Sequence, residues 1–287
     1  MEILPHTPPT PPHEKKGIST HSYLAIFSAA FLRTLAVGLG ITLFVVIAGV
    51  TAEVTEERQC NVSVRTLYGE LTTYSYGGDE TDSGALVRAL LRDDNDENIK
   101  AVILDIDSPG GLPVAGEEIA NQLSRLAKPN AAVIRSVGAS AAYWAASGAD
   151  IIFASQSSDV GSIGVIVSFP DESEKNKRDG VVYNEFASGK YKNLGTPTRP
   201  VTNDEKELLE EGIADVYEHF LSSVAMLRNM DIEKVRALAD GSTFAGVKAK
   251  ERGLIDAIGG IEEARAYVEE QIGEEAVLCE PNAEPLF

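Results

Sequence analysis

The sequence contains 287 residues, of which 44% are hydrophobic. This is enough to bury a full core, and the length fits one sizeable domain with additional segments. Lysine and arginine together number 25 against 44 aspartate and glutamate residues, so the net charge is -19. A surface this acidic repels phosphate backbones, which excludes nucleic acid as a partner.

The first 52 residues predict a tail and a membrane anchor. Residues 1–22 are rich in proline and polar side chains and bury too little apolar area to become ordered, so we expect a disordered cytoplasmic tail. Residues 23–52 predict one transmembrane helix. Within it, the stretch 34–50 carries no charge and spans about 25 Å as a helix, and Arg33 can extend its side chain to the lipid surface.

Charges on either side of this helix predict its orientation. Lys15 and Lys16 precede the helix and Glu53 follows it. The positive-inside rule keeps the N-terminus in the cytoplasm and places residues 53–287 outside, so we expect a single-pass protein of the cell membrane with an extracytoplasmic domain. The alternative is a cleaved signal peptide that ends in the small residues at 50–52, but the apolar stretch is longer than such peptides need.

Strand and helix patterns alternate after the anchor. The expected elements are a strand at 61–71, a helix from 83, a strand at 99–108, a helix at 114–128, a strand at 131–137, a short helix from 140, a strand at 150–154 and a long amphipathic helix at 201–230. This order predicts an α/β fold with a parallel sheet and flanking helices. Sites in such sheets lie beyond the carboxyl ends of the strands, where DSPGG (107–111) and GASAA (138–142) fall.

Two cysteines, Cys60 and Cys279, stand far apart in the sequence. Two thiols are too few for a disulfide framework or for a thiolate zinc site. We expect the pair to stay unpaired, with a single long-range disulfide as the less favoured alternative.

Ser140 is a candidate nucleophile that needs a base, because a serine hydroxyl is a weak nucleophile until its proton is removed. His219 is the one histidine beyond the anchor, and its amphipathic surroundings are typical of a helix surface. A lysine kept neutral by desolvation is the remaining solution. Lys190 and Lys192 are both candidates that spacing does not separate, and a strand here would place both on one face opposite Tyr191.

Backbone N–H groups near the serine predict an oxyanion hole. Gly110 and Gly111 lack side chains, so their N–H groups can approach a ligand closely. Ala141 follows the serine at a helix N-terminus and supplies a second donor. Taken singly, each motif also has an ordinary explanation: a helix N-cap for Ser140, a turn for DSPGG and two solvated lysines.

Taken in order, the motifs resemble the signal peptide peptidase A family of membrane-bound serine proteases over residues 61–272. They are DIDSPGG, SVGASAAYWAASGADIIFA, GSIGVI, SGKYKNLGTPTRPVT and GSTFAGVKAKERGLIDAIGGIEEA. The resemblance implies a Ser/Lys dyad on the fold shared by the Clp protease proteolytic subunit and the crotonases. It implies Ser140 as the nucleophile, Lys192 as the general base, Ser162 as the residue that orients the lysine and Gly111 in the oxyanion hole. Lys190 is then a bystander.

The resemblance also carries expectations about assembly and substrates. Ala141 and Ala142 stand where many members have two glycines, but alanine keeps the N–H that an oxyanion hole needs. The chain has one copy of the protease unit, similar to the short form of the family, in which serine and lysine come from neighbouring subunits of a ring. We therefore expect a homo-oligomer with intersubunit active sites and no metal or cofactor. Its expected substrates are remnant signal peptides and other unfolded or membrane-derived segments.

Two other functions stay open. A crotonase-like acyl-CoA enzyme would share the fold and the glycine-built oxyanion hole, and a catalytically silent membrane scaffold would share the fold alone. Separately, the charged segment 168–180 is expected as a surface turn rather than as a recognition loop.

Overall fold

The computed structural model describes residues 60–75 and 80–279. The expected tail at 1–22 and the expected anchor at 23–52 lie outside these ranges. Within the ranges, no helix is both long enough and apolar enough to cross a membrane.

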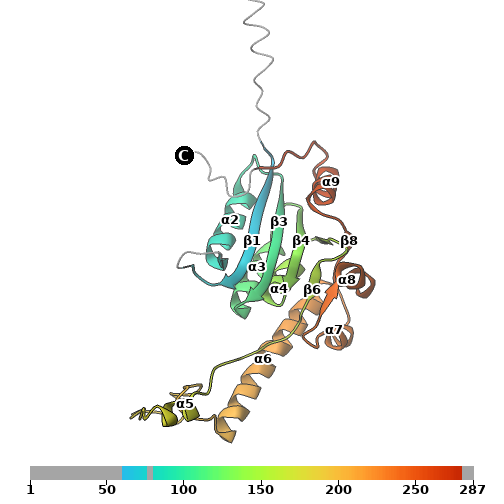
Figure 1. Ribbon diagram of the computed structural model, residues 1–287. Coiled ribbons are helices and arrows are strands. Elements are labelled where there is room, and N and C mark those ends of the chain that lie inside the picture. Colours follow the sequence, from blue (N-terminus) through green and yellow to red (C-terminus); the bar gives the residue numbers. More distant parts are fainter. Residues whose placement is uncertain (1–59, 76–79, 280–287) are drawn as a thin grey trace, which may run out of the picture. The chain divides into compact units, whose positions relative to one another are not determined.

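A mostly parallel sheet forms the centre of the fold, as the alternating pattern predicts (Figure 1). Its strand order is β2-β1-β3-β4-β5-β8, and a short strand, β6, pairs with β4 in parallel and with β7 in antiparallel. The strands are β1 (Val62–Thr72), β2 (Glu80–Asp82), β3 (Ala101–Gly111), β4 (Asn130–Ala139), β5 (Ile151–Ala154), β6 (Asp159–Gly161), β7 (Thr243–Ala245) and β8 (Ala257–Ile258). The two central strands, β3 and β4, run beyond their expected ends and reach the glycine and serine motifs.

Helices cover the two faces of this sheet unequally. The helices are α2 (Ser83–Asn95), α3 (Pro113–Leu123), α4 (Ala141–Ser147), α5 (Ser173–Arg178), α6 (Asn203–Leu227), α7 (Ile232–Leu238), α8 (Gly246–Arg252) and α9 (Ile261–Ile272). Alternation along β3 sends Val102 and Leu104 into a large core with α2, α3 and α4, whereas Ala101 and Ile103 face a smaller core with α9. The larger core therefore backs the strand ends that carry the predicted site.

The long helix α6 begins where the sequence predicts. Thr202 is its N-cap, and a capping box joins Thr202 to Glu205. The other end of the helix is fixed by packing, because Phe220, Leu221 and Val224 belong to the larger core. Between these ends no residue from 206 to 219 is buried, and Figure 1 shows α6 extending away from the sheet towards α5.

Residues 165–205, which we call the arm, connect the sheet to the start of α6. No residue from 165 to 204 is buried. The expected surface turn at 168–180 contains a short helix, α5, instead of a turn alone, although none of its side chains is buried. The arm is therefore held by something other than an apolar core.

A disulfide joins Cys60 to Cys279, so the expectation of unpaired cysteines is wrong. The segment before Cys279 runs parallel to the start of β1, where Leu278 pairs with Val62 and the Cys279 N–H donates to the Val62 carbonyl at 2.8 Å. This pairing brings the two Cα atoms to 4.9 Å across a sequence separation of 219 residues. No local sequence pattern predicts a contact between residues this far apart.

Candidate active site

The predicted site residues of the sheet lie at one edge, because neighbouring parallel strands end on the same side. β3 ends at Gly111, and β4 ends at Ala139, directly before Ser140. The register of the two strands shifts between Ile106 and Ser108, and after this irregularity Ser108 pairs with Gly138 near the edge. The chain then turns sharply at Ser140 into α4.

Ser140 has a backbone conformation that side chains other than glycine rarely adopt, with φ 52° and ψ -126°. Its N–H donates to the Gly161 carbonyl at 2.7 Å, and its own carbonyl accepts from the Trp144 N–H at 3.0 Å. Its hydroxyl makes no capping hydrogen bond to α4, although the residue occupies the N-cap position. Strain of this kind costs about 1–3 kcal/mol and tends to occur at functional sites. The geometry therefore disfavours the ordinary N-cap explanation.

The two glycines of DSPGG are required by close contacts and not by a simple turn. A Cβ on Gly110, where φ is 103°, would lie 2.8 Å from the Ser140 Cβ. Gly111 pairs with Leu71 on β1, and a Cβ there would lie 2.1 Å from the Leu71 carbonyl oxygen. The Leu71 carbonyl accepts from the Leu112 N–H at 2.9 Å, so the parallel ladder directs the Gly111 N–H away from β1.

Ser140, Gly111 and Ala141 line one small cavity of about 10 Å³, roughly the room for one water molecule. The remaining walls come from Pro113, Trp144, Gly164, Val165 and Phe220. The Trp144 and Phe220 rings stack at 4.5 Å, and the Trp144 indole N–H donates to the Ser223 hydroxyl at 2.8 Å. Ser140, the candidate nucleophile, therefore lines a tight pocket whose walls include two stacked aromatic rings. Trp144 and Phe220 were not predicted as site residues, because no motif in the sequence distinguishes them from ordinary core residues.

Ser162 lies one residue beyond the carbonyl that holds Ser140 in place. It also has a positive φ, 51°. Its N–H donates to the Ser242 carbonyl at 2.9 Å and its hydroxyl to the Gly241 carbonyl at 3.1 Å. The serine proposed to orient a lysine is thus fixed beside the Ser140 segment.

The two candidate lysines lie in a turn of the arm, so the strand arrangement that would place both on one face opposite Tyr191 is not formed. Lys190 forms an ion pair with Asp204, and its amine lies 4.9 Å from the centre of the Tyr191 ring. The Asp204 hydrogen bond, followed by that of Tyr191, raises the pKa of Lys190 above its ordinary value. This pairing favours the protonated form of Lys190, whereas a general base must be neutral.

Lys192 is exposed, and among the described residues no carboxylate pairs with its amine. The chain does not bring it to Ser140. Lys190 binds Asp204 at the start of α6, whereas Phe220, sixteen residues along the same helix, lines the Ser140 cavity. At 1.5 Å per residue this separates the two ends by about 24 Å.

His219 has a structural explanation, as its pattern predicts. Its Nε2 lies 3.1 Å from a Glu117 carboxylate oxygen, its ring meets the Trp144 ring edge-on at 5.3 Å, and its side chain is 54% exposed. In the described part of the chain, no three histidine, cysteine, aspartate or glutamate side chains gather as a metal site would require.

Comparisons with known proteins agree with the motifs. The model of the family described as Peptidase family S49 matches residues 122–274. A protein of Methanocaldococcus jannaschii named as a protease is 36% identical, over 62% of this chain and 58% of that protein. One of Enterococcus faecium named as signal peptide peptidase SppA is 35% identical, over 59% of this chain and 50% of that protein. The chain thus spans little more than half the length of these relatives.

Two further similarities are more distant or more partial. Protease 4 of Haemophilus influenzae is 32% identical, over 75% of this chain and 34% of that protein. Among solved structures, a mutant of the 1510-N membrane-bound stomatin-specific protease is similar with a TM-score of 0.49 and 16% identity, over 71% of this chain and 82% of that one.

Proposed function

The chain belongs to peptidase family S49, whose members are serine peptidases, and from this premise we propose that it cleaves peptide bonds with a Ser140/Lys192 dyad. The observation that carries the proposal is the strained Ser140 backbone beside Gly111 and Ala141 around one cavity. A strained backbone, a hydroxyl without a capping hydrogen bond and backbone N–H donors lie together at the edge where parallel sheets place their sites.

The proposed reaction needs only groups of this chain. Neutral Lys192 accepts the Ser140 hydroxyl proton as the oxygen attacks the peptide carbonyl. The N–H groups of Gly111 and Ala141 stabilise the oxyanion, and the lysine then protonates the leaving amine. A water molecule, activated by the same amine, hydrolyses the acyl-enzyme and restores Ser140. Ser162 orients the lysine through its hydroxyl.

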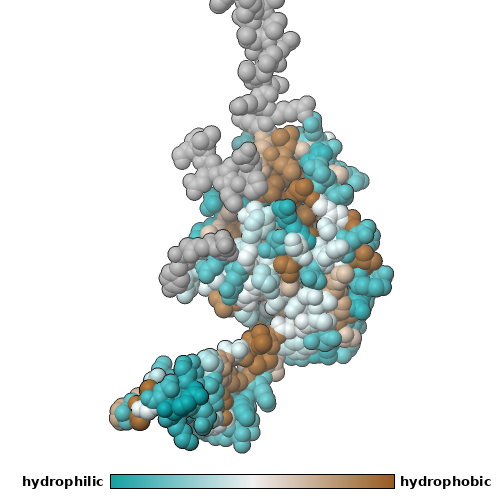
Figure 2. Space-filling view, in the orientation of Figure 1, coloured by the Kyte–Doolittle hydropathy of each residue, from teal (hydrophilic) through white to brown (hydrophobic). Residues whose placement is uncertain are grey.

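We propose that each site takes its lysine from a second copy of the chain. The separation along α6 supports this, because one chain leaves Lys192 far from its own Ser140. The arm that carries Lys192 also exposes large apolar side chains, including Ile166 at 86%, Val182 at 79% and Phe186 at 96%. Figure 2 shows hydrophobic surface on this part of the molecule. Such exposure in a soluble segment is typical of an interface.

The fold, location and substrates follow the same proposal. The parallel sheet with its helices supports the fold of the Clp proteolytic subunit and the crotonases. The Cys60–Cys279 disulfide supports an oxidising, extracytoplasmic setting for residues 53–287, anchored by a helix at 23–52. A relative named as signal peptide peptidase supports remnant signal peptides and other unfolded segments as substrates.

Mixing two inactive variants tests the dyad and the shared site together. Ser140→Ala and Lys192→Ala should each abolish hydrolysis of a peptide ester and of casein. Random co-assembly of equal amounts of the two variants should then restore up to about a quarter of the wild-type activity. Each site needs Ser140 from one subunit and Lys192 from its neighbour, and each subunit supplies the required residue about half of the time. Activity in either single variant would refute the dyad, and an inactive mixed assembly would refute the shared site. A wild-type assembly without activity would favour a silent scaffold.

A further inference from the structure

We infer that Arg199, Glu205, Asn193 and Glu185, which we call the arm network, position the turn that carries Lys192. The inference rests on the proposed function, because it takes Lys192 as the base. These residues do not touch the reacting atoms. They are positioning residues, and they act through the backbone on either side of Lys192.

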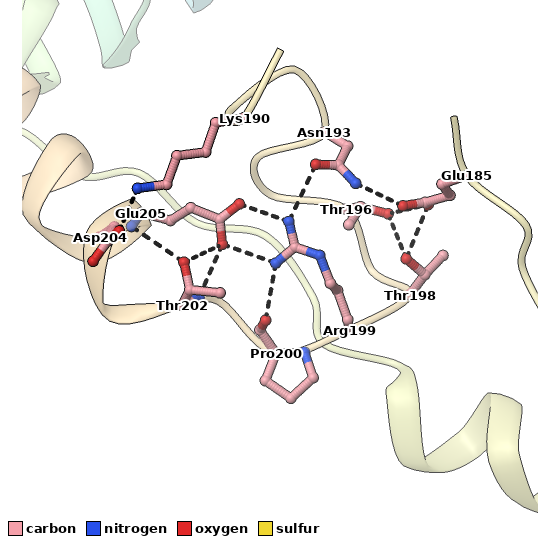
Figure 3. Close-up of polar contacts among 10 residues, drawn as sticks. All are labelled: Glu185, Lys190, Asn193, Thr196, Thr198, Arg199, Pro200, Thr202, Asp204 and Glu205. Carbon is pink, nitrogen blue, oxygen red and sulfur yellow. Dashed lines mark hydrogen bonds and ion pairs between the residues drawn. The ribbon is translucent and has the colours of Figure 1, made fainter. Parts of the chain in front are cut away.

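The centre of the network is a two-point ion pair. Arg199 Nη2 donates to Glu205 Oε1 at 2.6 Å, and Arg199 Nη1 donates to Glu205 Oε2 at 2.8 Å (Figure 3). The Glu205 side chain is only 3% exposed, although the rest of the arm is open to solvent. Two parallel charge-assisted bonds fix both the distance and the orientation of the partners.

Asn193, the residue after Lys192, is bound from both sides. Its Oδ1 accepts from Arg199 Nη2 at 3.2 Å, and its Nδ2 donates to Glu185 Oε2 at 2.7 Å. The second Glu185 oxygen accepts from the hydroxyls of Thr196 at 3.1 Å and Thr198 at 3.0 Å. Figure 3 shows Arg199 and Glu185 on opposite sides of Asn193. The neighbour of the base is therefore clamped between two charged side chains.

The network is anchored to the start of α6. Glu205 Oε2 accepts from the Thr202 backbone N–H at 2.9 Å and from its hydroxyl at 3.0 Å. The far end of this 25-residue helix packs in the larger core through Phe220 and Leu221. A continuous path of helix and hydrogen bonds thus joins the core of one chain to the turn that bears its lysine.

Hydrogen bonds carry this positioning because no apolar packing can do so. None of residues 165–204 is buried, so the arm lacks the core that fixes Ser140. A base misplaced by about 1 Å can lower the rate by about 100-fold, so a solvated turn needs an explicit clamp to be catalytically useful. The arm network supplies it.

The test compares variants of the network with a matched control in the full chain. Arg199→Met removes both hydrogen bonds to Glu205. Arg199→Lys keeps the positive charge but cannot bind both carboxylate oxygens as a guanidinium does. Asn193→Ala removes only the contacts next to Lys192. Arg236→Met is the control, because Arg236 also holds a carboxylate, that of Glu218, through both Nη atoms, outside the arm. The kcat and KM of peptide-ester hydrolysis and the mass of the assembly are measured for each variant.

We expect Arg199→Met and Asn193→Ala to lower kcat about 10- to 100-fold with little change in KM, and Arg199→Lys to be intermediate. Arg236→Met should change kcat less than twofold.

Three outcomes would overturn the inference: wild-type kcat in both Arg199→Met and Asn193→Ala, an equal loss in Arg236→Met, or losses that follow dissociation of the assembly. The Lys192→Ala variant distinguishes a failure of the positioning role from a failure of the proposed Ser140/Lys192 dyad. If Lys192→Ala keeps its activity, the dyad itself is wrong. If Lys192→Ala is inactive while the network variants are normal, only the positioning role is refuted.

Discussion

The proposed nucleophile and the proposed base of this protein are held in place by different physical means. Ser140 lies between a parallel sheet and a helix whose seven residues are all buried, and its strained backbone is maintained by packing and by one 2.7 Å hydrogen bond to Gly161. Lys192 lies on an arm without a buried residue from 165 to 204, where charged hydrogen bonds replace packing. A rigid nucleophile and a base on a solvated arm suit a site that is completed only when two copies meet.

The largest loss should come from a small change on the packed side. Gly110→Ala introduces a Cβ 2.8 Å from both the Ser140 Cβ and the Ala139 carbonyl oxygen. Because both contacts are close to backbone, Ser140 must move, and we expect activity to fall about 100-fold or more. Gly212→Ala is the control, since nothing lies within 4 Å of the added Cβ on α6. Equal kcat values in the two variants would show that Ser140 does not depend on this contact.

Removing the disulfide should lower the stability of the fold and leave the arm unchanged. Replacing both Cys60 and Cys279 by serine should lower the free energy of unfolding by about 2–4 kcal/mol, because the bond restrains a very long loop of the unfolded chain. Urea titration with and without reductant measures the effect. Reductant should destabilise the wild type and leave the double variant unchanged; a wild type insensitive to complete reduction would contradict the prediction.

The aromatic wall of the Ser140 cavity should set the size of the side chain that the site accepts. The cavity of about 10 Å³ favours a small side chain next to the scissile bond. Phe220→Leu removes the ring that stacks on Trp144, and it should raise kcat/KM for larger side chains over alanine by about 10-fold. A series of peptide esters differing in that one residue measures the ratio. An unchanged ratio would place the specificity pocket elsewhere.

Sequence patterns predicted the packed side far better than the arm, for a physical reason. Continuous apolar runs and a β-α-β order fix a parallel sheet, and parallel strands must bring Gly111 and Ser140 to one edge. No such periodicity exists around Lys192, where the sequence left the local structure open and a turn is found. Its contacts depend on where single polar side chains point, which spacing does not reveal.

Long-range contacts were equally hidden in the sequence. The pairing of Cys60 with Cys279 depends on a C-terminal segment that returns to β1, and the Trp144 and Phe220 stack depends on how α6 meets α4. Both follow from tertiary packing alone. The Asp204 ion pair, which distinguishes Lys190 from Lys192, is likewise a contact that the spacing of residues does not predict.

Acid should loosen the arm before it unfolds the core. Hydrogen bonds from Arg199, followed by the Thr202 N–H, lower the pKa of Glu205 from 4.5 to about 2. The contribution of Glu205 to the order of the arm is therefore complete above pH 4.5 and is lost as the pH falls through about 2. Pepsin cleavage of the inactive Ser140→Ala protein should increase within the arm between pH 4 and pH 2. Glu205→Gln should already be cleaved at pH 4, and equal wild-type cleavage at both pH values would contradict the mechanism.

The smallest effect on activity should come from replacing Lys190, the lysine that lies nearest in sequence to the proposed base, Lys192. Lys190 and Lys192 are two positions apart, but Lys190 is bound to Asp204, and the hydrogen bond to that carboxylate raises the pKa of Lys190 and disfavours the neutral amine that a base needs. Its ion pair is exposed at both ends, and such pairs contribute little to stability. Lys190→Ala should therefore change kcat/KM less than about twofold, whereas Lys192→Ala removes activity in the same assay. The opposite ranking would mean that the Asp204 ion pair breaks on assembly and frees Lys190 as the base, which would transfer the catalytic role along the same turn.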